Sequence, residues 1–140
     1  MKMGGSARAV LTAGAVYDLI VAVPLAFPPT TGPDLNLLFA INTWLGLGGG
    51  MPIFEPVHLL FISLFGVFAA AWGIFKLWTM KFDLIRLDLI MRVAVLAVLA
   101  WYALTSEVHG LIYVFIAMDI VWTVLNMWAL RQLPLVAKRA

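Results

Sequence analysis

Phe54–Trp78 has the sequence FEPVHLLFISLFGVFAAAWGIFKLW, and this stretch decides the fold of the chain. Between Glu55 and Lys76 it contains no Asp, Glu, Lys or Arg. About 20 apolar residues are enough for a helix to cross the hydrocarbon core of a bilayer. Three other stretches meet the same condition: about 7–27, 83–104 and 108–131. We therefore predict an all-α fold, a four-transmembrane-helix up-down bundle, with residues 1–140 forming a single integral membrane domain.

The composition supports a membrane protein and excludes several other classes. Apolar residues make up 64% of the chain and charged residues 11%, and the mean hydropathy is +1.05. A soluble domain is close to half apolar. The net charge is only +2, without a basic stripe, so a nucleic-acid partner is excluded and the lipid bilayer is the expected surrounding. Cysteine is absent, which excludes disulfides, thiolate metal sites and iron–sulfur clusters.

The basic residues indicate how the helices are oriented. All of them lie before the first stretch, around the junction of the second and third, or after the fourth: Lys2, Arg8, Lys76, Lys81, Arg86, Arg92, Arg131, Lys138 and Arg139. Cytoplasmic loops retain positive charge, so both termini are expected in the cytoplasm. The first stretch contains Asp18 and ends at Pro28-Pro29 without a cleavage site, which indicates a retained helix. A compact chain without organelle signals favours the bacterial cytoplasmic membrane.

The connection between the first two spans is long enough for a short extra helix. Thr30 to Asp34 is expected to form a polar turn, with Asp34 capping a helix over about 35–45. The glycines of 46–50 then end that helix. It is too short to span a bilayer, so we expect it to lie at the outer interface.

Small residues are spaced for close helix packing on two of the spans. Gly66, Ala70 and Gly73 form one such face, and alanines form a second on the following span: Ala94, Ala97, Ala100 and Ala103. Such faces allow helices to approach closely. They suit packing within the bundle, a homo-oligomer or a larger membrane complex.

A group of ionisable residues lies at membrane depth. Asp18 and Asp119 are each about ten residues into a span, and Asp88 and Arg92 are one helical turn apart. Such residues are costly in a bilayer and mark either function or a paired structural contact. The functional interpretation is a proton or substrate relay, or a polar floor for a ligand. The structural interpretation, which we favour, is an Asp18–Arg92–Asp119 pairing that fixes the order of the helices.

Aromatic side chains lie close to these charges in the sequence. Asp119, Trp122 and Asn126 share one helical face by their spacing, and Tyr17 precedes Asp18. Buried Trp and Asn side chains need hydrogen-bond partners, so this face is expected to point inward. An apolar pocket with a polar floor suits a quinone, a sterol-like molecule or another aromatic ligand. Ordinary core packing is the commoner explanation for such residues.

Histidines at the opposite end of the bundle provide a candidate metal or haem site. Glu55 and His58 share a helix face, and His109 begins the last span. Two histidines on different helices can ligate haem, and a carboxylate added to them can hold a metal. Hydrogen bonding at the membrane interface is the more frequent role of such histidines. Nucleotide-binding, catalytic-serine and zincin motifs are not present.

The helical plan resembles that of the DoxX-like group of small bacterial inner-membrane proteins. The resemblance rests on Glu55 and the following Gly66-x-x-x-Ala70-x-x-Gly73 run. It implies a membrane accessory to redox or quinone-linked systems, and it transfers no site residue.

The leading functional prediction is a non-enzymatic accessory or binding protein. It would hold an apolar ligand of the quinone or lipid type, or support a membrane complex. Two alternatives stay open. One is a haem- or metal-dependent redox protein using the histidines named above. The other is a small oligomeric transporter in which Asp18 or Asp119 titrates.

Overall fold

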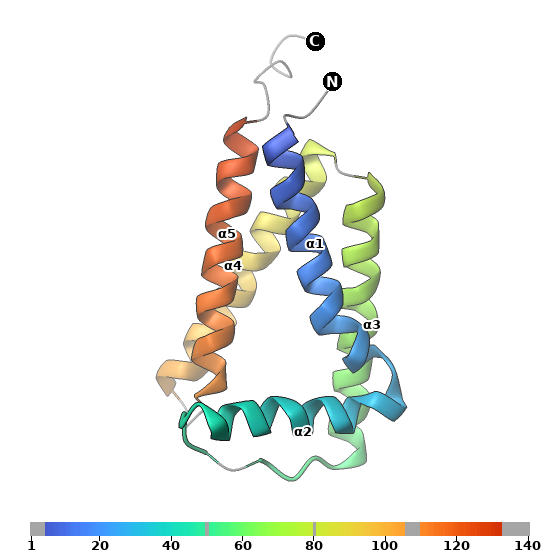
Figure 1. The fold of residues 1–140 in the computed structure, drawn as a ribbon, viewed down its shortest axis with the longest axis vertical. Coiled ribbons are helices and arrows are strands. Elements are labelled where there is room, and N and C mark those ends of the chain that lie inside the picture. Colours follow the sequence, from blue (N-terminus) through green and yellow to red (C-terminus); the bar gives the residue numbers. More distant parts are fainter. Residues whose placement is uncertain (1–4, 50, 80, 106–109, 133–140) are drawn as a thin grey trace.

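The chain folds into helices, as the computed structural model of residues 5–49, 51–79, 81–105 and 110–132 shows (Figure 1). There is no strand among these residues. Five helices follow one another along the chain: α1 (Gly5–Ala26), α2 (Pro28–Trp44), α3 (Pro56–Thr79), α4 (Phe82–Thr105) and α5 (Leu111–Gln132). Four of them, all except α2, are long and apolar enough to cross a membrane. The predicted all-α bundle is confirmed, and the chain is a small multi-pass membrane protein.

The distribution of buried residues is that of a membrane protein. Among the described residues, the buried apolar side chains are mostly alanines, and buried polar or charged side chains are equally numerous. Large apolar side chains lie outside, with Phe68 73% exposed. The accessible surface is 9533 Å², against roughly 7,200 Å² for a soluble monomer of this mass. A bilayer, which solvates apolar side chains, accounts for this pattern.

Glycines bring α1 and α3 into close contact. A methyl group on Gly66 would lie 2.6 Å from the carbonyl carbon of Leu25, and one on Gly73 would lie 3.0 Å from the side chain of Leu19. The contact at Gly66 is with backbone atoms that cannot move aside, so this position requires glycine. At Gly73 the Leu19 side chain would have to shift by a few tenths of an ångström to admit a methyl group. Ala70, between them, is half-buried. The predicted small-residue face is therefore the α1–α3 interface.

The second small-residue stripe lies elsewhere. Ala94 and Ala97 are exposed, whereas Ala100 and Ala103 are half-buried. α4 packs mainly against α5, and Figure 1 shows it running from the α3 turn behind α1 to the beginning of α5. α3 and α4 are antiparallel, as a short connection requires, yet they diverge and make few contacts. α1 instead contacts both α3 and α5.

The two ends of the bundle are chemically different. One end carries the start of α1, the α3–α4 junction and the end of α5 (Figure 1), and we call it the basic end after Arg8, Lys81, Arg86 and Arg131. α2 lies across the opposite end, nearly perpendicular to the other helices. We call this the α2 end.

α2 begins seven residues earlier than the sequence predicted. It starts at Pro28 with Phe27 as its N-cap residue, so the expected polar turn over Thr30 to Asp34 is helical and Asp34 is not a cap. The prediction was wrong because proline favours the first turn of a helix as well as ending the preceding one. Asp34 is half-buried within α2, and burial raises the pKa of its carboxyl group.

Two threonine hydroxyl groups donate hydrogen bonds to backbone carbonyl groups at the junction between α1 and α2. Pro28 and Pro29 have no N–H, so the carbonyl groups of Pro24 and Leu25 lose their usual helical donors. The Thr30 hydroxyl donates to the Pro24 carbonyl at 2.6 Å, and the Thr31 hydroxyl donates to the Leu25 carbonyl at 2.9 Å. The sharp bend between the helices therefore leaves these backbone groups satisfied.

Buried hydrogen bonds hold α2 at both ends. Thr31 Oγ1 lies 2.9 Å from Ser63 Oγ on α3. Near the other end, Asn42 Oδ1 accepts from the Leu111 N–H of α5 at 3.0 Å, and Asn42 Nδ2 donates to the Gly48 carbonyl at 2.9 Å. Asn42 is fully buried. α2 thus connects α3 to α5. Its exposed Trp44 suits a membrane interface.

Replacing Asn42 by alanine is expected to lower the free energy of unfolding by about 1–3 kcal/mol, because a buried N–H and a carbonyl lose their partners. Thermal unfolding in mild detergent, followed by circular dichroism, measures the change. Asn36→Ala is the matched control, since Asn36 is exposed on the same helix. Equal unfolding temperatures for the two variants would show that Asn42 does not stabilise the attachment of α2 to α5.

Candidate functional site

Five charged side chains from all four long helices meet inside the bundle. We call them the charge cluster: Asp18 of α1, Lys76 of α3, Asp88 and Arg92 of α4, and Asp119 of α5. Their side chains are between 6% and 19% exposed. The structure thus brings together all four charged residues that the sequence assigned to membrane depth, and it adds a lysine.

Arg92 is the centre of the cluster. Its Nη2 donates to both oxygens of Asp18 at 2.8 Å, and its Nη1 donates to Asp119 Oδ1 at 2.8 Å. Its Nε lies 3.2 Å from Asp88 Oδ2, one helical turn away. One guanidinium therefore links α1, α4 and α5, using the fixed fork of donors that arginine provides. The pairing of Asp18, Arg92 and Asp119 that the sequence suggested is present.

Lys76 was missed in the sequence because it lies near the end of α3, where a lysine usually marks the membrane boundary. Its ammonium group pairs with Asp18 Oδ2 and lies 3.0 Å from Asp88 Oδ1. The available signal was its spacing from Gly73, since residues three apart share a helix face and Gly73 packs on α1. Lys76 therefore ties α3 into the cluster.

Asp88 is the most fully satisfied carboxylate. Besides Lys76 and Arg92, it accepts from Trp72 Nε1 at 2.8 Å and from Asn126 Nδ2 at 2.9 Å. Its residue is only 4% exposed. Donors from α3, α4 and α5 thus surround it, so the charge is buried with partners on both oxygens.

Only one oxygen of the Asp119 carboxylate has a hydrogen-bond partner. Its Oδ1 accepts from Arg92, but its Oδ2 is buried without a hydrogen-bond partner. The cluster as a whole contains three carboxylates and two cations, so its formal charge is −1 when all groups are ionised. The excess negative charge and the free carboxylate oxygen therefore belong to the same cluster.

Two further polar atoms near Asp119 lack partners. They are Trp122 Nε1 and Thr123 Oγ1, and with Asp119 Oδ2 they are the only buried side-chain polar atoms left unsatisfied in the described part of the chain. The indole of Trp122 lies between Gly14, where an added methyl group would be 3.3 Å from the ring, and Tyr17, whose ring centroid is 5.4 Å away. The α5 face that the sequence predicted to point inward does so.

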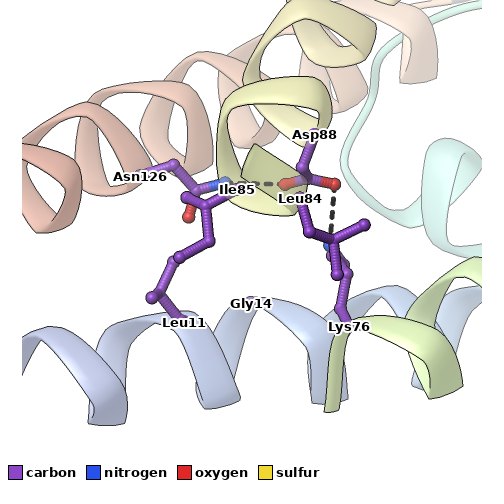
Figure 2. A pocket seen from close by; sticks show the side chains of 7 residues that line it. All are labelled: Leu11, Gly14, Lys76, Leu84, Ile85, Asp88 and Asn126. Atoms are coloured by element: carbon purple, nitrogen blue, oxygen red, sulfur yellow. Dashed lines mark hydrogen bonds and ion pairs between the residues drawn. The ribbon is translucent and has the colours of Figure 1, made fainter. Parts of the chain in front are cut away.

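A small cavity lies beside the cluster, and Figure 2 shows the side chains that line it. Its volume is about 20 Å³, enough for about one water molecule. It is lined by Leu11, Gly14, Lys76, Leu84, Ile85, Asp88 and Asn126. In Figure 2, Asp88 and Asn126 lie in the upper part of the view, and Lys76 and Leu11 lie below them. A water molecule there would meet both charged and amide groups.

The candidate metal site at the α2 end is only partly described. Glu55 and His58 are exposed, and the Glu55 backbone N–H donates to His58 Nδ1 at 3.1 Å. His109 lies outside the described residues. Among those described, no three His, Cys, Asp or Glu residues form a group that can hold a metal ion. A metal or haem site that includes His109 stays a prediction from the sequence.

Comparison with protein-family models, with characterised proteins and with solved structures gives no match to this chain. The resemblance to the DoxX-like group therefore stays a prediction as well.

Arg92→Ala is expected to lower the free energy of unfolding in detergent by about 3–5 kcal/mol, because it leaves buried carboxylates without their shared cation. Combining it with Asp119→Asn should cost less than the sum of the two single changes, since the second change removes one of the unpaired charges. Thermal or denaturant unfolding of all four proteins measures this coupling. Arg8→Ala, at an exposed position near the start of α1, is the control. Strictly additive changes in the free energy of unfolding, both in this cycle and in the same cycle with Asp18→Asn in place of Asp119→Asn, would contradict a structural pairing.

Proposed function

We propose that this chain is a non-enzymatic membrane protein that binds an apolar ligand of the quinone or lipid type beside Trp122. The observation that supports this is the buried indole N–H of Trp122, which has no acceptor among the described residues. Buried tryptophan N–H groups usually have one, and leaving a donor unsatisfied costs about 1–3 kcal/mol. A ligand oxygen that accepts this hydrogen bond recovers that free energy.

The surroundings of Trp122 favour an oxygen-bearing, flat and apolar ligand. Tyr17 and Trp122 provide aromatic surface, and the neighbouring Thr123 hydroxyl can donate a second hydrogen bond because it too is unpartnered. A quinone carbonyl or a lipid ester oxygen accepts such bonds, and neither carries a negative charge that Asp119 would repel. These groups therefore suit the site better than a phosphate.

The space beside the cluster limits how the ligand binds. The cavity of about 20 Å³ beside the cluster holds only a water-sized group, and Trp122 does not line it. Sites that enclose a drug-sized molecule have several hundred Å³ (~300–1,000). We therefore place only the polar end of the ligand at Trp122. Its apolar body would lie in the bilayer against exposed apolar side chains of α1 and α5, such as Val16, Ile20 and Val121.

The exposed alanines of α4 favour a second candidate, a supporting role in an oligomer or a larger membrane complex. Ala94 and Ala97 face outward, and small residues on a free helix face allow another helix to approach closely. Native mass spectrometry of the protein in mild detergent separates the candidates. A single chain carrying a small molecule supports ligand binding, whereas a defined oligomer supports the second role.

Substitution of Trp122 by phenylalanine is expected to reduce co-purified ligand about tenfold, since the ring is kept but a hydrogen bond worth about 1.4 kcal/mol is lost. Protein purified in mild detergent is extracted, and bound quinones and lipids are quantified by mass spectrometry. Trp128→Phe is the matched control, because Trp128 is an exposed tryptophan of the same helix. Equal ligand content in the two variants would remove the proposed site. A haem spectrum or bound metal at one per chain would favour the redox alternative instead.

We also propose that the basic end faces the cytoplasm of a bacterial cell. The support is the distribution of lysine and arginine, all of which belong to segments that begin or end on one side of the predicted topology. Such asymmetry sets the orientation of multi-pass proteins.

Single introduced cysteines test this orientation cleanly, because the chain contains none of its own. A membrane-impermeant maleimide should label Asn36→Cys, at an exposed position on α2, in intact cells with the outer membrane permeabilised. Ser6→Cys, exposed at the basic end, should react only after the inner membrane is opened. The reverse labelling pattern would invert the proposed topology.

A further inference from the structure

We propose that the charge cluster binds one proton, held on Asp119 Oδ2. The proton is a ligand of the cluster itself, so this inference does not depend on the proposed apolar ligand.

The first step is the charge balance. Arg92 and Lys76 supply two positive charges, whereas three aspartates face them. The titratable and charged groups around Asp119 are Tyr17 and Asp18 of α1 and Asp88 and Arg92 of α4. Lys76 of α3 reaches the same cluster by pairing with Asp18 and Asp88. With these groups ionised as usual and Tyr17 neutral, one negative charge is uncompensated. An uncompensated charge within a bilayer-spanning bundle is costly, and one added proton removes it.

The hydrogen bonds indicate which carboxylate takes the proton. Both oxygens of Asp18 accept from Arg92, and both oxygens of Asp88 have donors. Only Asp119 has an oxygen without one. A proton placed on Asp18 or Asp88 would have to displace an existing donor, whereas Asp119 Oδ2 is free to receive it.

A protonated Asp119 also has an acceptor nearby. Thr123 is one helical turn further along α5, and its hydroxyl is buried without a partner. The Asp119 O–H can donate to this oxygen after a side-chain rotation. One proton would then give two of the three unpartnered atoms a partner. The Thr123 hydroxyl, which accepts in this bond, can still donate to a ligand beside the Trp122 N–H.

Infrared spectroscopy of the purified protein in detergent tests this proposal, because a protonated carboxyl group has a C=O stretch separate from that of a carboxylate and sensitive to D₂O. We expect one such band from the cluster at neutral pH and its loss in Asp119→Asn. Asp119→Glu retains an acidic group, so it tests the site even if Asp119→Asn does not fold. This variant should keep the band but shift its frequency. A cluster without an acid band, or a band unchanged in both variants, would overturn the proposal.

Asp34→Asn is the matched control, because Asp34 is a half-buried carboxyl group on α2, away from the cluster. It should leave the cluster band in place.

Discussion

The ion pairing of Arg92 is the interaction on which the rest of the structure depends. A guanidinium inside a bilayer is stable only when carboxylates surround it, and here they come from α1, α4 and α5. Lys76 extends the same network to α3. Because every long helix contributes at least one member, the charges determine which helices become neighbours. Apolar side chains cannot do this in a membrane, where lipid solvates them as well as protein does.

The packing of the helices follows from that arrangement and from two glycines. Gly66 and Gly73 let α1 and α3 approach closely, whereas the described residues of α3 and α4 make few contacts with each other. α4 is instead connected to α1 and α3 through long charged side chains. α2 completes the bundle at the opposite end, where Thr31 and Asn42 attach it to α3 and α5. Polar contacts therefore fix the bundle both at the charge cluster and at the α2 end, and much of the apolar surface is left to the bilayer.

The unsatisfied atoms of α5 distinguish this cluster from a purely structural one. A pairing that served only to order the helices would be expected to balance its charges and use all its donors and acceptors. Here one carboxylate oxygen, one indole N–H and one hydroxyl stay free within two turns of helix. A proton and a ligand oxygen are the chemical species that satisfy them, which is why ligand binding and proton binding are the roles proposed.

The sequence by itself determined the number of spans, the all-α class and the residues at membrane depth, because apolar length and charge cost are local properties that a bilayer enforces. It also indicated the pairing of Arg92 with Asp18 and Asp119, since few partners are available at that depth. It did not predict the role of Lys76, the early start of α2 at Pro28 or the capping of α5 by Asn42. Each of these depends on which helices become neighbours. Only the tertiary structure decided them, because a side chain 58 residues away from Asp18, or a cap supplied 69 residues before Leu111, leaves no periodic signal in the chain.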